Sequence, residues 1–88
     1  MLKISVISDS DQAICFRLEG RLAGPWVEEL RKLSEQSLAQ EKTLSLDLEG
    51  VWSVDRRGMA LLRDLETRNV SHLSCSLFLK RQLEDVAE

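Results

Sequence analysis

The chain has little of what catalytic and metal sites are usually built from. His72 is its only histidine, and its two cysteines, Cys15 and Cys75, lie far apart. A zinc site needs several such ligands at close spacing, and nucleophilic catalysis needs a base within reach of the nucleophile. We therefore expect a protein without metal, cofactor or enzymatic activity. We assign His72 to a polar surface loop and both thiols to buried, reduced positions.

Other classes of function also lack their signal. The four glycines form no phosphate-binding loop, which leaves a small-ligand or nucleotide sensor with little support. No apolar run approaches the roughly 20 residues that span a bilayer, and the first residues lack the features of a signal peptide. We therefore expect a cytoplasmic protein without direct membrane insertion. The net charge of −3, with no basic block, argues against nucleic-acid binding.

What the chain does contain is typical of one compact domain. Its 88 residues, 43% hydrophobic and 31% charged, suffice for a single hydrophobic core. No linker, internal repeat or low-complexity tract divides it. We expect one domain spanning residues 1–88.

Strands are predicted where apolar and polar residues alternate, at residues 2–6, 14–18, 44–48 and 73–77. The first two segments, separated by the turn-forming residues 9–11, should form a hairpin, and Gly20 should end the second. The third should run parallel to the second, because a helix joins them. Its polar residues Ser45, Asp47 and Glu49 suggest that the helices cover one face only.

A helix is predicted over Pro25–Ala39, because proline suits the first turn and apolar residues recur at helical spacing. Its expected inner stripe is Trp26, Leu30 and Leu33, with Val27 beside it.

A second helix is predicted from its N-cap Asp55 to about Arg68. Its expected stripe is Gly58, Leu61, Leu62, Leu65 and Asn69. A short closing helix is expected over Leu79–Val86. The predicted fold is thus α/β, a mixed sheet of about four strands with helices mainly on one face, in the order β-β-α-β-α-β-α.

Two segments resemble the STAS family, the sulfate transporter and anti-sigma factor antagonist domains. Residues 44–62 hold an apolar strand with Leu46-Asp47-Leu48, followed by a turn in which Asp55 and Gly58 match the family's Asp-x-x-Gly. Residues 16–22 are similar to the family's second strand and its exit. The resemblance implies a protein-binding regulator, acting in bacteria as an anti-sigma factor antagonist in transcription signalling. Its partner would be a kinase-type anti-sigma factor.

The resemblance also locates a partner-binding region at the start of the second helix. Carried over to this sequence, the region comprises Trp52, Ser53, Asp55, Arg56, Arg57, Gly58 and Met59. In the family, a serine or threonine between the aspartate and the glycine is phosphorylated, which releases the partner. Here Arg56 and Arg57 stand at those positions, so the usual phosphosite is absent. Ser53, a strand-end residue, is a weak substitute.

The arginine pair has two interpretations. In the first, Arg56 and Arg57 are solvated and pair with Asp55, Glu49 or Asp64. In the second, they dock an acidic partner, because a guanidinium binds a carboxylate or phosphate with two parallel hydrogen bonds. For both Trp52 and Trp26 we weigh partner contact against packing, and packing is the default for a large aromatic side chain.

Two further possibilities remain open. Family members generally continue with another strand and a long helix, so the short C-terminus would leave an edge that a homodimer could cover. The family also includes cytoplasmic accessory subunits of ABC transporters, which is the main alternative function beside a small-ligand sensor module.

Overall fold

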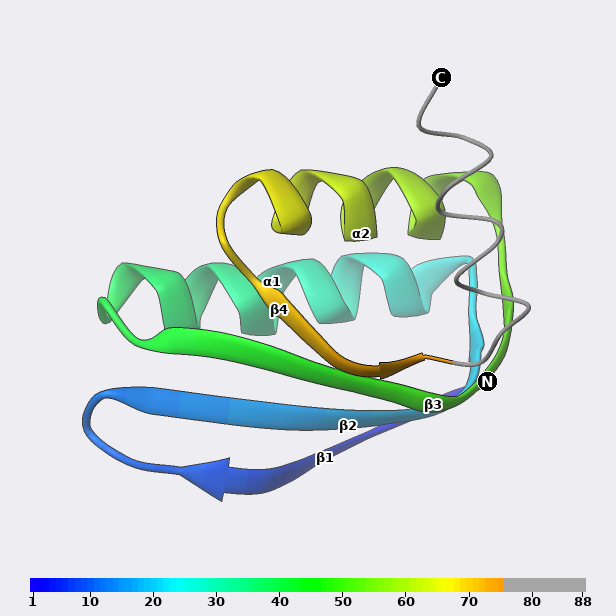
Figure 1. The fold of residues 1–88 in the computed structure, drawn as a ribbon. Coiled ribbons are helices and arrows are strands. Elements are labelled where there is room, and N and C mark those ends of the chain that lie inside the picture. Colours follow the sequence, from blue (N-terminus) through cyan, green and yellow to red (C-terminus); the bar gives the residue numbers. More distant parts are fainter. Residues whose placement is uncertain (76–88) are drawn as a thin grey trace.

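The computed structural model describes residues 1–75. The fold is built on a mixed sheet of parallel and antiparallel strands (Figure 1). Strands β1 (Leu2–Asp9) and β2 (Ala13–Leu22) form an antiparallel hairpin. Strand β3 (Thr43–Val54) runs parallel to β2, and β4 (Ser71–Cys75) runs parallel to β3. The strands therefore lie in the order β1-β2-β3-β4.

Two helices connect the parallel strands and lie on the same face of the sheet (Figure 1). Helix α1 (Pro25–Ala39) joins β2 to β3, and helix α2 (Arg56–Thr67) joins β3 to β4. The predicted mixed α/β arrangement with helices on one face is thus confirmed. The closing helix expected over Leu79–Val86 lies outside the described residues.

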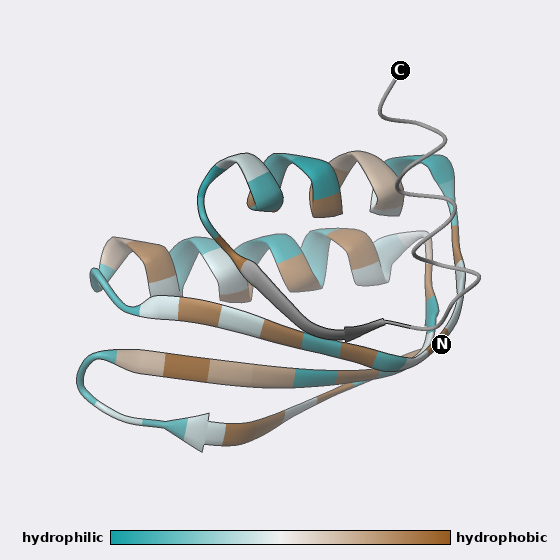
Figure 2. Ribbon diagram, in the orientation of Figure 1, coloured by the Kyte–Doolittle hydropathy of each residue, from teal (hydrophilic) through white to brown (hydrophobic). Residues whose placement is uncertain are grey.

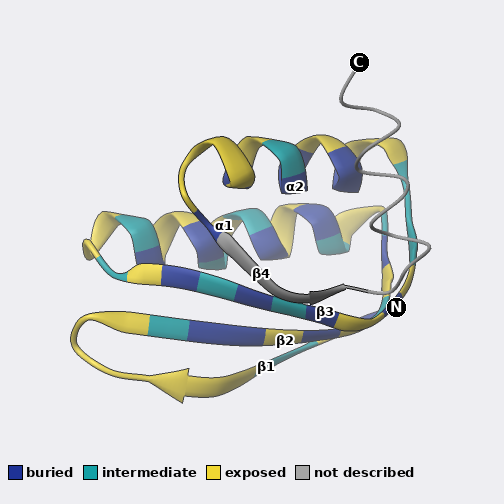
Figure 3. Ribbon diagram, in the orientation of Figure 1, coloured by how far each residue is buried: buried dark blue, intermediate teal, exposed yellow. Residues whose placement is uncertain are grey.

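The core fills the space between the helices and the sheet. Hydrophobic and polar residues alternate along much of β3 (Figure 2), and its three leucines, Leu44, Leu46 and Leu48, are buried (Figure 3). Burying a leucine side chain stabilises the fold by about 1.5–3 kcal/mol, so this alternation fixes which face of the sheet meets the helices. The side chains buried most completely are Leu18, Leu22, Leu30, Leu44, Leu46, Leu48, Leu61, Leu62, Leu65, Val27 and Val51.

The hairpin differs from the prediction at both ends. Gly20 does not end β2, which continues to Leu22; instead Gly20 adopts φ 111° inside the strand. A Cβ there would lie 2.6 Å from the Met1 carbonyl oxygen, so glycine allows β2 to lie this close to the backbone at the start of β1. Val6, expected on the inner face of β1, is 56% exposed, because β1 is an edge strand and bulges between Val6 and Ser8.

Helix α1 has the predicted bounds, but its buried face is rotated relative to the predicted stripe. Val27, Leu30, Ser34 and Ser37 are buried, whereas Trp26 and Leu33 are only partly buried against the core. Ser34 and Ser37 were not part of the predicted stripe. Their small size admits them to the interface, and the Ser37 hydroxyl donates to the Leu33 carbonyl oxygen.

Helix α2 (Arg56–Thr67) begins after Asp55 and ends beside its C-cap Arg68, close to the predicted bounds, but Asn69 does not extend its inner stripe. Asn69 is exposed and lies beyond the helix with φ 67°, a left-handed conformation that asparagine tolerates. Its N–H donates to the Glu66 carbonyl oxygen, and the Val70 N–H donates to that of Leu65, which closes the helix end.

His72 belongs to β4 and not to a loop, which corrects the prediction. Its backbone is in register with Leu46 of β3, so pairing along a strand edge overrides the polar composition of this segment. The prediction for Cys15 is confirmed, because its thiol is free and buried. Burial also raises the pKa of that thiol, with a further contribution from the nearby Asp47 carboxylate.

Candidate functional site

The predicted partner-binding residues lie where β3 ends and α2 begins, beside the end of β2 and the start of α1 (Figure 1). Neighbouring parallel strands end at the same edge of the sheet, so the two strand ends and the two helix starts come together there. The Asp55 N–H donates to the Leu22 carbonyl oxygen across this edge at 3.1 Å. We call this group of segments, residues 22–28 and 52–59, the helix-start edge.

Asp55 joins the two helix starts. Its Oδ1 accepts from the Gly58 N–H at 2.7 Å, which is the predicted N-cap of α2. Its Oδ2 accepts from the Gly24 N–H at 3.1 Å, and Gly24 is the N-cap residue of α1. One carboxylate therefore satisfies a backbone donor at each helix start, and both of its oxygens are occupied.

These contacts favour the ionised form of Asp55. The hydrogen bonds from Gly58 and Gly24 lower the pKa of the carboxyl group from 3.8, and Arg57 and Arg21 lower it further by their charge. Partial burial opposes the shift. The net direction is downward because a carboxylate that accepts two N–H groups is stabilised as an anion.

Gly58 is required by a close approach of α2 to the strand ends. A Cβ at this position would lie 2.8 Å from the Leu22 carbonyl oxygen and 2.9 Å from Val54 Cγ1. Both distances are shorter than real Cβ contacts allow. Gly58 therefore sets how closely the helix-start edge can pack, and because it is buried it is not itself accessible to a partner.

The two arginines after Asp55 differ in their surroundings. Arg57 Nη2 lies 3.8 Å from Glu28 Oε1 of α1, which is not among the predicted partners Asp55, Glu49 and Asp64. Within residues 1–75, Arg56 is exposed and forms no ion pair. Of the acids that were named, Asp64 lies 3.7 Å from Arg68, at the other end of α2.

Trp52 is the most exposed aromatic group at the helix-start edge. Its side chain is 68% exposed on β3, so the default expectation that it packs is wrong. The neighbouring Val51 faces the core, and strand alternation turns Trp52 to the opposite face. Trp26, by contrast, packs partly against the core, in agreement with the default prediction of packing.

The remaining predicted residues are less accessible. Ser53 is half-buried near the end of β3, in register with Arg21 of β2. Met59 is 6% exposed and belongs to the core. The structure thus leaves Trp52, Arg56 and Arg57 as the exposed side chains of the predicted set, with Asp55 and Gly58 holding the backbone beneath them.

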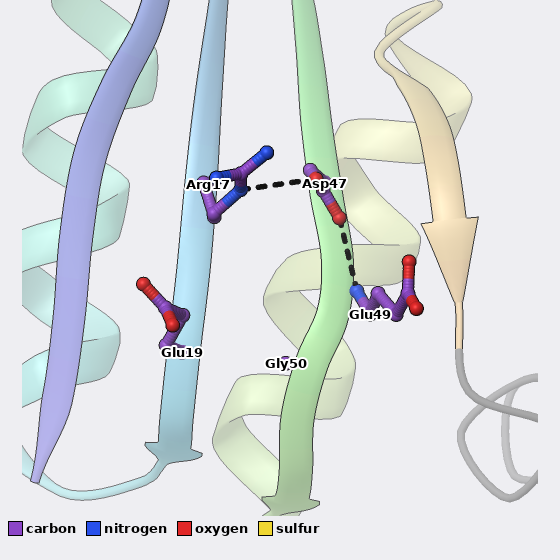
Figure 4. Close-up of a pocket in the computed structure, with 5 residues that line it drawn as sticks. All are labelled: Arg17, Glu19, Asp47, Glu49 and Gly50. Atoms are coloured by element: carbon purple, nitrogen blue, oxygen red, sulfur yellow. Dashed lines mark hydrogen bonds and ion pairs between the residues drawn. The ribbon is translucent and has the colours of Figure 1, made fainter.

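A second feature lies on the open face of the sheet, away from the helices (Figure 4). An open depression of about 410 Å³ is lined by Arg17, Glu19, Asp47, Glu49 and Gly50. Arg17 Nε donates to Asp47 Oδ2 at 3.3 Å, and the Glu49 N–H donates to Asp47 Oδ1 at 3.1 Å. Asp47 is therefore a polar residue of the sheet face, as predicted, and its contacts are internal to the sheet.

Within the described part of the chain, no group of three or more histidine, cysteine, aspartate or glutamate side chains is placed to hold a metal ion. Neither α1 nor α2 has the length and apolar character needed to cross a membrane.

Sequence reasoning missed two contributors to the helix-start edge. Gly24 offers its N–H to Asp55, and Glu28 approaches Arg57, although both lie far from their partners along the chain. Glu28 carried one signal, its place in the first turn of α1, where an acid suits the helix dipole. Nothing in the sequence indicated which arginine it would meet.

Comparison with known proteins matches this arrangement of elements to a solved structure and not to a sequence. No protein-family model matches the chain, and no curated protein matches it in sequence. The structure of the anti-sigma factor antagonist SpoIIAA in its unphosphorylated form superimposes with a TM-score of 0.68. That likeness covers 93% of this chain and 82% of the other, at 18% sequence identity. The chain therefore has a STAS-like fold, as the sequence motifs predicted.

Proposed function

We propose that this chain is a protein-binding regulatory module that acts as an anti-sigma factor antagonist, with the helix-start edge as its contact surface. The observation that carries the proposal is the exposure of Trp52, at 68%, a few residues before the exposed Arg56 and Arg57. Tryptophan and arginine are the residue types most enriched among the side chains that dominate binding at protein interfaces. The STAS-like fold shared with SpoIIAA supports the choice of partner class.

The proposed partner is a kinase-type anti-sigma factor that presents an acidic segment. Asp55, whose two oxygens are occupied by backbone donors, is committed to holding the edge together. The exposed positive charges that follow Asp55 in the chain are the guanidinium groups of Arg56 and Arg57, which bind carboxylates well. This arrangement favours a constitutive antagonist, because arginine cannot be phosphorylated as a serine or threonine is.

The proposal has further parts that follow from the resemblance. We place the protein in the bacterial cytoplasm and assign it binding without catalysis or a cofactor. The seven-element order with a closing helix, the single domain over residues 1–88 and a possible homodimer also stay predictions.

The test is affinity purification of the tagged protein from its own cells, with mass spectrometry of the proteins recovered. We expect a kinase-type anti-sigma factor, and we expect Trp52→Ala and Arg56→Ala each to reduce its recovery. The control for Trp52→Ala is Val6→Ala, which shortens an exposed apolar side chain of a different strand, β1. The control for Arg56→Ala is Lys32→Ala, which removes an exposed cation of α1.

The other outcomes reject the proposal in different ways. Recovery of a transporter ATPase would instead support the alternative hypothesis, that the chain is an accessory subunit of an ABC transporter. Recovery of the chain alone would indicate a self-associating module. A kinase-type partner whose recovery is unaffected by Trp52→Ala and Arg56→Ala would move the contact surface away from the helix-start edge.

A further inference from the structure

We infer that Glu28 is an internal competitor for Arg57, which an acidic partner segment must displace before both arginines can bind it. This inference rests on the proposed function, because it concerns how the same surface is occupied when no partner is present. It assigns a role to a residue of α1 that lies outside the predicted binding set.

The geometry shows one carboxylate oxygen shared between two cations. Glu28 Oε1 lies 3.8 Å from Arg57 Nη2 of α2 and accepts from Arg31 Nε of its own helix at 3.3 Å. The Arg57 side chain is 70% exposed and that of Glu28 is 50% exposed. Glu28 therefore lies beside one nitrogen of Arg57, where its negative charge competes with that of a partner's carboxylate.

The contact is suited to displacement. Exposed ion pairs contribute little to stability, and this one is longer than a hydrogen bond. When Arg57 turns to another carboxylate, Glu28 keeps Arg31, so no charge is left without a counter-ion. Arg56 has no ion pair within residues 1–75, and so it can meet a partner without breaking one.

The two arginines therefore have separable roles. Arg56 gives the initial attraction, and Arg57 adds its contact only after exchanging Glu28 for the partner's carboxylate. Removing the charge of Glu28 should tighten binding, because the competing contact is gone while the arginines remain.

The experiment titrates the ¹⁵N-labelled full chain with a synthetic hexaglutamate peptide at low salt and follows the backbone and arginine Nε–H signals by NMR. Glu28→Gln is compared with Glu29→Gln, which removes the same charge from the same turn of α1. Glu29 is exposed and forms no ion pair within the described residues. Any general effect of net charge is therefore common to both variants.

We expect Glu28→Gln to bind the peptide about two- to fivefold more tightly than Glu29→Gln does, as the loss of one weak ion pair predicts. In an Arg57→Ala background this difference in affinity should vanish, because Glu28 and the peptide no longer compete for the Arg57 guanidinium group. Equal affinities of the two glutamine variants, or a difference that persists without Arg57, would overturn the inference.

A further variant separates this inference from the proposal beneath it. If replacing both Arg56 and Arg57 by alanine leaves peptide binding unchanged, the acidic-partner surface itself is wrong. If binding needs the arginines while Glu28→Gln behaves as Glu29→Gln does, the surface stands and only the role of Glu28 is rejected.

Discussion

Helices α1 and α2 are tied to each other near both ends, and the two ties differ in kind. At the helix-start edge, the Asp55 carboxylate accepts from backbone N–H groups of Gly58 and Gly24. At the other end, Arg68 donates from Nη1 and Nη2 to the two carboxylate oxygens of Glu35, each at 2.8 Å. The first tie fixes backbone groups, whereas the second joins two exposed side chains.

The difference lies in which donors the two carboxylates satisfy. Backbone donors at a helix start have no partner within the helix, so a carboxylate there replaces a missing hydrogen bond. An exposed ion pair replaces only contacts with water. The helix-start edge carries the exposed residues that we propose bind a partner, and a backbone held by hydrogen bonds suits a surface that should not have to be ordered on binding.

The largest expected effect comes from forcing the helix-start edge apart. Gly58→Val should lower the free energy of unfolding by about 3 kcal/mol, because its Cβ would overlap the Leu22 carbonyl oxygen. Urea unfolding followed by circular dichroism measures this loss. Ala60→Val, on the exposed side of the same helix, is the matched control and should cost well under 1 kcal/mol. Similar losses for the two variants would show that the close approach is not what Gly58 provides.

Removing the shared acceptor should have the next largest effect. Asp55→Ala should cost about 1–2 kcal/mol, because both helix starts lose a hydrogen-bond acceptor. The comparison is Asp64→Ala, which removes an exposed acid from the same helix. Amide hydrogen exchange should quicken at Gly24 as well as at Gly58 in Asp55→Ala. Faster exchange at Gly58 alone would mean that Asp55 caps only α2.

The same tie should weaken in acid. Because folding lowers the pKa of Asp55 from 3.8, its contribution is complete above that value and is lost as the pH falls through the lower folded-state pKa. The stability difference between the wild type and Asp55→Asn should therefore shrink below about pH 4. Urea unfolding at pH values from 7 down to 3 measures it. A difference that grows on acidification would contradict the sign of the shift.

The smallest effect is expected at the other tie. Arg68→Gln removes the bidentate pair with Glu35 and the longer contact with Asp64. We expect a small fall in the urea midpoint that disappears at high salt, because both partners are exposed. Lys32→Gln, at an exposed cation of α1, is the control. A loss as large as that of Asp55→Ala would remove the distinction between the two ends.

Local patterns in the sequence predicted the elements that depend on short-range physics. Alternation at residues 44–48 identified β3, and Pro25 marked the start of α1. Asp55 identified itself as an N-cap by its position before a helical pattern. The prediction failed at Asn69, which was expected on the inner stripe of α2 but follows the helix in a left-handed backbone conformation. It also failed at His72, where pairing with β3 overrode the polar character of the segment.

The candidate site was predictable in location and not in its contacts. The Asp-x-x-Gly turn and its arginines placed the candidate site at the start of the second helix, and the structure puts that turn between β3 and α2. That Trp52 is exposed depends on which face of β3 the helices cover beyond Gly50, and the register between β2 and β3 shifts in this region. That Met59 is buried depends on the close packing that Gly58 permits.

By itself, the sequence determined the periodicities, the helix starts and the absence of a phosphorylatable residue between Asp55 and Gly58, because each is a property of neighbouring residues. Only the tertiary structure decided that the Asp55 carboxylate also serves Gly24 and that Glu28 meets Arg57. Those contacts join segments distant in sequence, and they exist because parallel pairing of β2 with β3 brings both helix starts to one edge.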